Sequence, residues 1–170
     1  MARIEWADGP TNTMSRRPRV GSSGAVLATG EPPRHRVLLV EDHASIAEAT
    51  AELMRLHGLE VRVATTGSDA PQMAEAFNPV LILCDLRLPD MTGLDVVAAL
   101  RVRCVRNDLL IAIITATSVE YLREIVGQAG TCGVNMVLSK PLTNETLIAL
   151  VSQLEVLHPR QASRGLRESA

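Results

Sequence analysis

The stretch LILCDLRLPDMTG, residues 81–93, places an aspartate between an apolar run and a turn. Its first four residues are apolar on consecutive positions, which is typical of a strand buried on both faces. Asp85 follows this run directly, and Pro89 and Gly93 then mark a loop. The stretch therefore predicts a buried strand that presents a carboxylate at its carboxyl end.

Similar apolar runs alternate with amphipathic segments over residues 36–157. Five segments predict strands: 37–40, 59–64, 80–84, 109–114 and 134–138. Five segments predict helices. The first is 44–57, which ends at Gly58, and the second begins after Ser68 or Asp69 as its cap, with Pro71 in its first turn. The third follows Gly93, and the last two are 118–129 and 143–157. Because a crossover between parallel strands is almost always right-handed, we expect an open, doubly wound α/β sheet.

Polar side chains stand at the carboxyl ends of four of these strands. They are Glu41 and Asp42, Asp85, Thr115, and Lys140, which is the only lysine in the chain. Ligands of doubly wound sheets collect at this edge, so we expect these side chains to lie close together. Carboxylates gathered in one crevice either have a raised pKa or hold a cation, and an all-oxygen ligand set suits Mg²⁺. Asp85 would then be both a ligand and a nucleophile toward a phosphoryl donor, with Lys140 and Thr115 beside the transferred group.

Four motifs carry a resemblance to a known family: VLLVEDH (37–43), LILCDLRLPDMTGLD (81–95), IAIITATS (111–118) and LSKPL (138–142). On these motifs the chain resembles a response-regulator receiver domain of two-component signalling, of the single-domain type. The resemblance implies a flavodoxin-like fold, with a five-stranded parallel sheet in the strand order 2-1-3-4-5.

The resemblance also implies roles for individual residues. Asp85 would be phosphorylated, Asp42 would bind Mg²⁺ with Glu41 helping through water, and the backbone carbonyl of Arg87 would be a further ligand. Thr115 would move toward the phosphoryl group and Lys140 would pair with it. Pro141 would follow Lys140 through a cis peptide bond, which in the family aims the lysine.

Two departures from the family pattern concern tuning and output. An aromatic residue usually stands three positions before the lysine, where this chain has Val137. We therefore expect the output of the fourth helix and fifth strand to be weakened or made differently. Arg87 and Thr117 flank the phosphoryl group in place of carboxylates or amides that could orient water, so we expect a long-lived phosphorylated state.

Composition and charge divide the chain into three parts. Residues 1–35 predict a disordered arm, residues 36–157 a receiver domain, and residues 158–170 a flexible tail. Residues 37–157 contain 15 acids and 8 bases, an excess of 7 negative charges that disfavours direct binding to nucleic acid. The sequence predicts no membrane insertion, and its three scattered cysteines favour a cytoplasmic location.

The expected function is that of a phosphoryl-accepting switch or relay. A histidine kinase or a histidine phosphotransfer protein would be the donor, and an unknown downstream protein would receive the signal. We expect no enzyme activity beyond the domain's own phosphotransfer and dephosphorylation. The alternative is a phosphorylation-independent docking module, or a receiver within a larger hybrid kinase assembly. An aspartyl-phosphate hydrolase is disfavoured because Arg87 stands where such an enzyme has its second aspartate.

Several other residues have structural interpretations. His43 is expected in the first turn of a helix without a ligand partner, and Cys84 is expected to be a small buried hydrophobic residue. Arg101, Arg103 and Arg106 are expected to form a solvated helix face.

Overall fold

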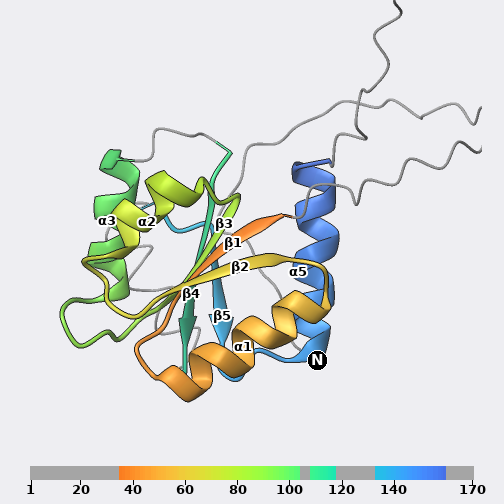
Figure 1. The fold of residues 1–170 in the computed structure, drawn as a ribbon, viewed down its shortest axis with the longest axis horizontal. Coiled ribbons are helices and arrows are strands. Elements are labelled where there is room, and N and C mark those ends of the chain that lie inside the picture. The colour runs from red at the N-terminus through yellow and green to blue at the C-terminus, as the bar shows by residue number, and fades with distance from the viewer. Residues whose placement is uncertain (1–34, 104–107, 118–132, 160–170) are drawn as a thin grey trace, which may run out of the picture.

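Five parallel strands form one sheet in the order β2-β1-β3-β4-β5, as expected (Figure 1). The computed structural model describes residues 35–103, 108–117 and 133–159. The strands are β1 Arg36–Val40, β2 Glu60–Ala64, β3 Leu81–Asp85, β4 Leu110–Thr115 and β5 Met136–Ser139. The fold is the doubly wound, flavodoxin-like α/β fold, and β3 is the central strand of the sheet, between β1 and β4.

Four helices are described, and they lie on both faces of the sheet. They are α1 Ala44–Leu56, α2 Ala70–Phe77, α3 Gly93–Arg103 and α5 Asn144–Leu157. The helix expected over residues 118–129 lies outside the described residues. So do most of the expected arm, at residues 1–34, and most of the expected tail, at residues 160–170.

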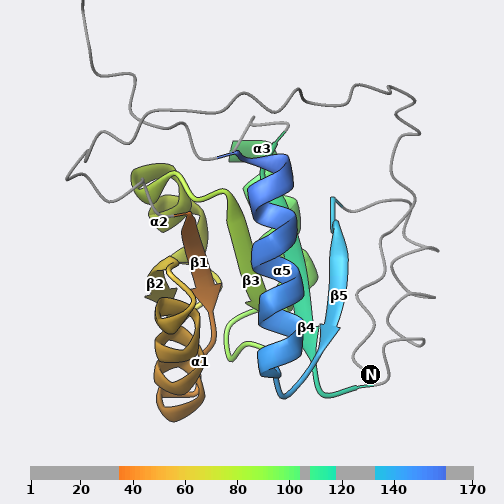
Figure 2. The ribbon, with the colours of Figure 1, turned by 90° about the vertical axis from the view of Figure 1, so that its right-hand side faces the viewer.

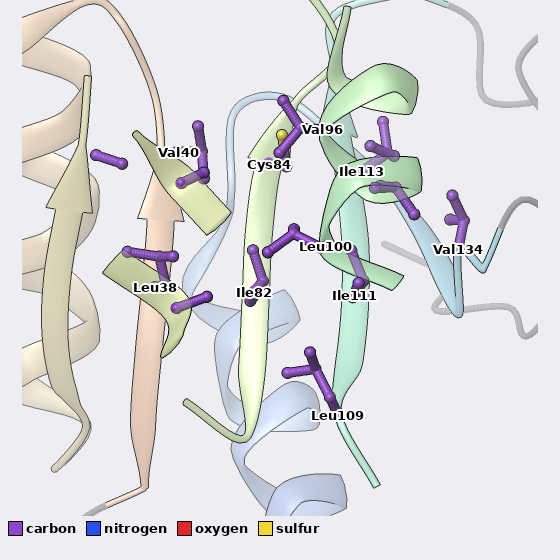
Figure 3. Close-up of a cluster of buried hydrophobic side chains, with 14 of the residues drawn as sticks. Leu38, Val40, Ile82, Cys84, Val96, Leu100, Leu109, Ile111, Ile113 and Val134 are labelled. Carbon is purple, nitrogen blue, oxygen red and sulfur yellow. The ribbon is translucent and has the colours of Figure 1, made fainter. Parts of the chain in front are cut away.

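Side chains of alternate strand residues pack into two hydrophobic layers, because successive residues of a strand point to opposite faces. One layer, drawn in Figure 3, joins Leu38, Ile82 and Ile111 of the strands to Val96 and Leu100 of α3. The other joins strand residues such as Leu39 and Leu83 to buried side chains of α1 and α5. In Figure 2, α1 and α5 cover the face of the sheet that is turned to the viewer. The consecutive apolar runs are thus buried on both sides.

Local signals set the ends of the helices. Gly58 follows α1 with a φ of 78°, a left-handed conformation that glycine adopts at low cost. Asp69 is the N-cap residue of α2, although its side chain makes no capping bond and instead accepts a hydrogen bond from Thr66 Oγ1. Thr143 caps α5 by accepting a hydrogen bond from the Thr146 amide. Gly58 and Thr143 thus act as their residue types predict, whereas Asp69 stands at the expected position without capping the helix through its side chain.

Arg101 does not belong to a solvated face, so that expectation was wrong for this residue. Its guanidinium donates to the carbonyl oxygens of Gly133 and Leu109 and to the side-chain oxygen of Asn135. The planar fork of donors suits several acceptors at once, and it joins α3 to the start of β4 and the segment before β5. Arg103 is exposed as expected, and Arg106 lies outside the described residues.

Candidate functional site

Asp85 ends β3 at the carboxyl edge of the sheet, and it is only 8% exposed. Gly93 packs against it from the start of α3: a Cβ atom on Gly93 would lie 2.3 Å from the Asp85 carbonyl oxygen. The Arg87 amide donates to Oδ1 of Asp85 at 3.2 Å. The end of the strand and the following loop therefore fix this carboxylate in place, and its second oxygen is left for other partners.

Lys140 joins two of the acids that the sequence singled out. Its ammonium donates to Oε2 of Glu41 at 2.5 Å and to Oδ2 of Asp85 at 2.6 Å. Glu41 directly follows β1 and Lys140 directly follows β5, so the contact brings together three strand ends. The Lys140 amide also donates to the Thr115 carbonyl at 2.7 Å, and the Lys140–Pro141 bond is cis as expected.

The charges at this edge do not balance. Glu41 is 2% exposed, Asp85 is nearly as buried, and Asp42 is half-buried beside them. Lys140 is the one ammonium that contacts this group in the described part of the chain. Burial lowers the pKa of Lys140, but its hydrogen bonds to Asp85 and Glu41 outweigh this effect and raise the pKa, so the group is charged at neutral pH. The remaining negative charge and the oxygen donors fit a hard divalent cation such as Mg²⁺.

His43 has partners, contrary to the expectation from sequence. Its ring Nδ1 lies 2.9 Å from Oδ1 of Asp42 and 3.4 Å from Oε1 of Glu41. Glu41, Asp42 and His43 form a group whose possible ligand atoms all lie within 4.8 Å of one another. The adjacency of the three residues in sequence was a signal for this group, but the side-chain direction of His43 could not be predicted from it.

The remaining predicted site residues lie in the loop after β3, at the end of β4 and just after it, and on β5. Thr115 ends β4, is 2% exposed, and accepts a hydrogen bond from the Thr117 amide at 2.9 Å. Arg87 is exposed, and Thr117 is half-buried. Val137 is 6% exposed, pairs with Ile113 of β4, and belongs to the hydrophobic layer that packs against α3. The roles expected for these residues concern the phosphorylated state of the domain.

Asp90 connects the loop after β3 to the loop after β2, a contact that could not be predicted from the sequence. Its two carboxylate oxygens accept hydrogen bonds from the amides of Gly67 and Ser68 at 2.9 and 2.8 Å. These backbone hydrogen bonds lower the pKa of Asp90. The loop that carries Arg87 is therefore held at a second point, five residues beyond Asp85.

Cys84 is a buried free thiol beside Asp85, as expected. Burial, reinforced by the negative charges of Asp85 and Glu41, raises its pKa to about 12. A thiol with this pKa is protonated at neutral pH, so Cys84 is suited to packing and not to nucleophilic chemistry.

A groove of about 590 Å³ opens beside the site. Its lining is mainly apolar and includes Ile46 and Leu53 of α1 and Leu142 before α5, together with Glu41 and Lys140. Ile46 is 43% exposed, because α1 packs on the sheet through Ala47, Ala51 and Met54 instead. An apolar surface thus adjoins the charged groups.

Comparison with known proteins identifies the family. The model of the response regulator receiver domain matches residues 37–152. The chain belongs to this family. Receiver domains are phosphoryl-accepting signalling switches of two-component systems, are phosphorylated by histidine kinases, and bind Mg²⁺ at an acidic site. The arrangement of Asp85, Lys140 and the acid pair in this receiver domain is consistent with that general function.

Individual relatives agree with the family match. The aerobic respiration control sensor protein ArcB of Escherichia coli is 39% identical over 124 residues, which cover 71% of this chain and 15% of ArcB. The cell cycle transcriptional regulator CtrA of Caulobacter vibrioides is 30% identical over 116 residues, which cover 68% of this chain and 48% of CtrA. The receiver domain therefore matches less than half of the length of either protein.

A solved structure shows the same fold. The chemotaxis response regulator CheY4 of Vibrio cholerae superposes with a TM-score of 0.62 at 30% identity, covering 72% of this chain and 99% of CheY4. Among the described residues, no helix is both long enough and apolar enough to cross a membrane.

Proposed function

We propose that this receiver domain accepts a phosphoryl group on Asp85 from a phosphohistidine. The observation that supports this most directly is the buried Asp85 carboxylate, held 2.6 Å from the Lys140 ammonium at the open edge of the sheet. A carboxylate oxygen forms the new bond to phosphorus as the bond between phosphorus and the histidine nitrogen breaks, and the imidazole leaves with that electron pair. The product is an acyl phosphate.

The cation in this proposal is Mg²⁺, held by the Asp42 and Asp85 carboxylates and the backbone carbonyl of Arg87, with Glu41 assisting through water. When bound, Mg²⁺ neutralises part of the charge on the phosphoryl oxygens. Lys140 then exchanges its contact with Asp85 for one with a phosphoryl oxygen, while Glu41 keeps its hold on the ammonium. Thr115 offers its hydroxyl from the neighbouring strand end.

The donor in this proposal is a histidine kinase or a histidine phosphotransfer protein, and the output is a protein contact. The apolar groove beside Lys140 supports a protein donor, since its exposed aliphatic lining adjoins the reacting carboxylate. The domain performs no other reaction than its own phosphorylation and dephosphorylation. Val137 cannot move a ring between buried and exposed positions, so the face of β5 transmits the change differently from a face with an aromatic residue there.

Intact mass spectrometry tests the proposal. The protein is incubated with Mg²⁺ and acetyl phosphate beside two variants, Asp85→Asn and Asp95→Asn. Asp95 is an exposed aspartate of α3 and is the matched control. We expect the wild type and Asp95→Asn to gain one phosphoryl group and Asp85→Asn to gain none. Equal gain in all three proteins, or gain in none of them, would contradict the assignment of Asp85.

A further inference from the structure

The loop between β3 and α3 is closed at its base by main-chain contacts. The Gly93 amide donates to the Leu86 carbonyl at 2.8 Å, and Arg87 and Thr92 form an antiparallel bridge. Asp90 lies between the two bridging residues, at the tip of the loop. Arg87 is therefore held from one side by the base of the loop, and its position also depends on what holds the tip.

Two hydrogen bonds hold this tip to the loop after β2. One oxygen of Asp90 accepts from the Gly67 amide at 2.9 Å, and the other accepts from the Ser68 amide at 2.8 Å. Hydrogen bonds to an ionised acceptor are roughly twice as strong as those between neutral groups. Because both donors belong to the main chain and both carboxylate oxygens are used, the pair fixes the direction of the carboxylate as well as its position.

Close packing beside Asp90 supports the same contact. Gly67 is buried, and a Cβ atom on it would lie 2.6 Å from Cγ of Met91 and 2.8 Å from Cγ2 of Val96. A side chain at this position would have to displace both neighbours. Glycine therefore lets the main chain that carries the two donors approach the tip of the other loop.

Arg87 stands between this contact and the phosphoryl acceptor. Its amide donates to Oδ1 of Asp85 at 3.2 Å, which is the long end of the usual range for such a bond. A small displacement of the main chain would break this hydrogen bond. The same displacement would shift the Arg87 carbonyl, which the proposed function assigns to Mg²⁺.

We propose that Asp90 is a positioning residue of the acceptor site. By holding the tip of its loop against Gly67 and Ser68, it fixes the main chain of Arg87 beside Asp85. Its carboxylate acts through that main chain and not on the phosphoryl group. The effect on Mg²⁺ and on phosphorylation rests on the proposed function, whereas the effect on the Arg87 amide does not.

Amide NMR of the metal-free protein tests the positioning directly. The proteins to compare are the wild type, Asp90→Ala and Asp69→Ala. Asp69 is the matched control, because it is an exposed aspartate whose carboxylate accepts a hydrogen bond from Thr66 within the loop after β2. We expect the Arg87 amide signal to shift and its hydrogen exchange to become several-fold faster in Asp90→Ala, with no such change in Asp69→Ala. An Arg87 amide that is unchanged in Asp90→Ala would overturn the inference.

Titration with Mg²⁺, followed at the Asp85 amide, tests the consequence for the cation. Partners that orient a metal ligand contribute about 10- to 100-fold to affinity, and Asp90 orients one ligand of several. We therefore expect Asp90→Ala to weaken Mg²⁺ binding by about 3- to 10-fold and to slow phosphorylation by acetyl phosphate. Asp90→Asn keeps the length of the side chain and one acceptor oxygen, so its affinity should lie between those of Asp90→Ala and the wild type.

Arg101→Ala separates positioning from stability. It removes hydrogen bonds from α3 to Leu109, Gly133 and Asn135, which belong to neither loop. We expect this variant to be less stable than the wild type and yet to bind Mg²⁺ with unchanged affinity, at a temperature at which melting curves show every variant to be folded. Equal weakening of Mg²⁺ binding in Arg101→Ala and Asp90→Ala would mean that Asp90 acts through stability alone, which would overturn the inference.

The inference and the proposed function fail in different ways. A wild type that is phosphorylated on Asp85, with Asp90→Ala equal to it in Mg²⁺ affinity, phosphorylation rate and Arg87 amide signal, refutes the role of Asp90 alone. A wild type that binds no Mg²⁺ and gains no phosphoryl group refutes the proposed function. In that case the Arg87 amide of metal-free Asp90→Ala decides on the positioning: a shifted signal supports it, and an unchanged signal refutes it.

Discussion

The Lys140 ammonium lies 2.6 Å from Oδ2 of Asp85, an oxygen of the carboxylate that we propose as the phosphoryl acceptor. The same ammonium contacts Glu41, so one positive charge serves two buried acids. Lys140 therefore neutralises part of the negative charge that a bound divalent cation would also neutralise, and the proposed function assigns both cations to the phosphoryl group once Asp85 is phosphorylated.

Replacing Lys140 should separate metal binding from phosphoryl transfer. We expect Lys140→Ala to bind Mg²⁺ several-fold more tightly than the wild type, because a competing cation has been removed from Asp85. We also expect its phosphorylation by acetyl phosphate to slow strongly, because the ammonium no longer stabilises charge on the phosphoryl oxygens. NMR titration with Mg²⁺, followed at the amides of Asp85 and Arg87, measures the first effect, and intact mass over time measures the second.

Arg103→Ala is the control for Lys140→Ala, since it removes one positive charge at an exposed position of α3. It should change neither the affinity for Mg²⁺ nor the rate of phosphorylation. Weaker Mg²⁺ binding in Lys140→Ala than in this control would contradict the competition described for the lysine.

The Arg101 contacts predict a stability difference between two arginines on one helix. Arg101→Ala removes the donors from three acceptors: the carbonyl oxygens of Leu109 and Gly133 and the side-chain oxygen of Asn135. Hydrogen bonds of a charged donor contribute about 1.5–3 kcal/mol. We expect its free energy of unfolding to fall by about 2 kcal/mol. The free energy of unfolding of Arg103→Ala should lie within about 0.5 kcal/mol of the wild-type value. Urea unfolding measures both, and similar losses in the two variants would show that Arg101 is not a structural tie.

The fold and the central site could be predicted because their signals are local. Apolar runs of strand length and polar residues at strand ends are visible in single segments, and parallel topology then brings the ends together. The side of α1 that packs on the sheet was harder to predict. Ala47 and Ala51 are buried while the larger Ile46 is exposed, because small side chains let the helix approach the strands.

The contacts that sequence reasoning missed join positions far apart in the chain. Arg101 meets Asn135, and Asp90 meets Gly67, across separations of 34 and 23 residues. An arginine near a helix end or an aspartate in a turn has the same local pattern whether it is solvated or bonded. Only the packing of the elements decides between the two.

The lifetime of the phosphorylated state should depend on Arg87. Arg87 is exposed two residues after Asp85 and has no carboxylate or amide with which to orient an attacking water. We expect loss of the phosphoryl group to take much longer than seconds, and Arg87→Asn to shorten the half-life several-fold. Intact mass after removal of the donor follows the decay. A half-life of seconds that is unchanged by Arg87→Asn would refute this role.

Asp90 should make the tie between the two loops dependent on pH. Hydrogen bonds from the amides of Gly67 and Ser68 lower its pKa, so the folded state holds the proton less tightly than the unfolded chain does. The stabilisation is thus present above the unfolded pKa, near 3.9, and is lost as the pH falls through the lower folded value. We expect Asp90→Asn to lower the melting temperature at pH 7, and the difference from the wild type to shrink as the pH falls below about 4.

Glu75→Gln, at an exposed position of α2, is the control. Its melting temperature should differ little from that of the wild type at either pH. If the melting temperature of Asp90→Asn stays below that of the wild type by the same amount from pH 7 to pH 3, the charge of Asp90 does not hold the loops together.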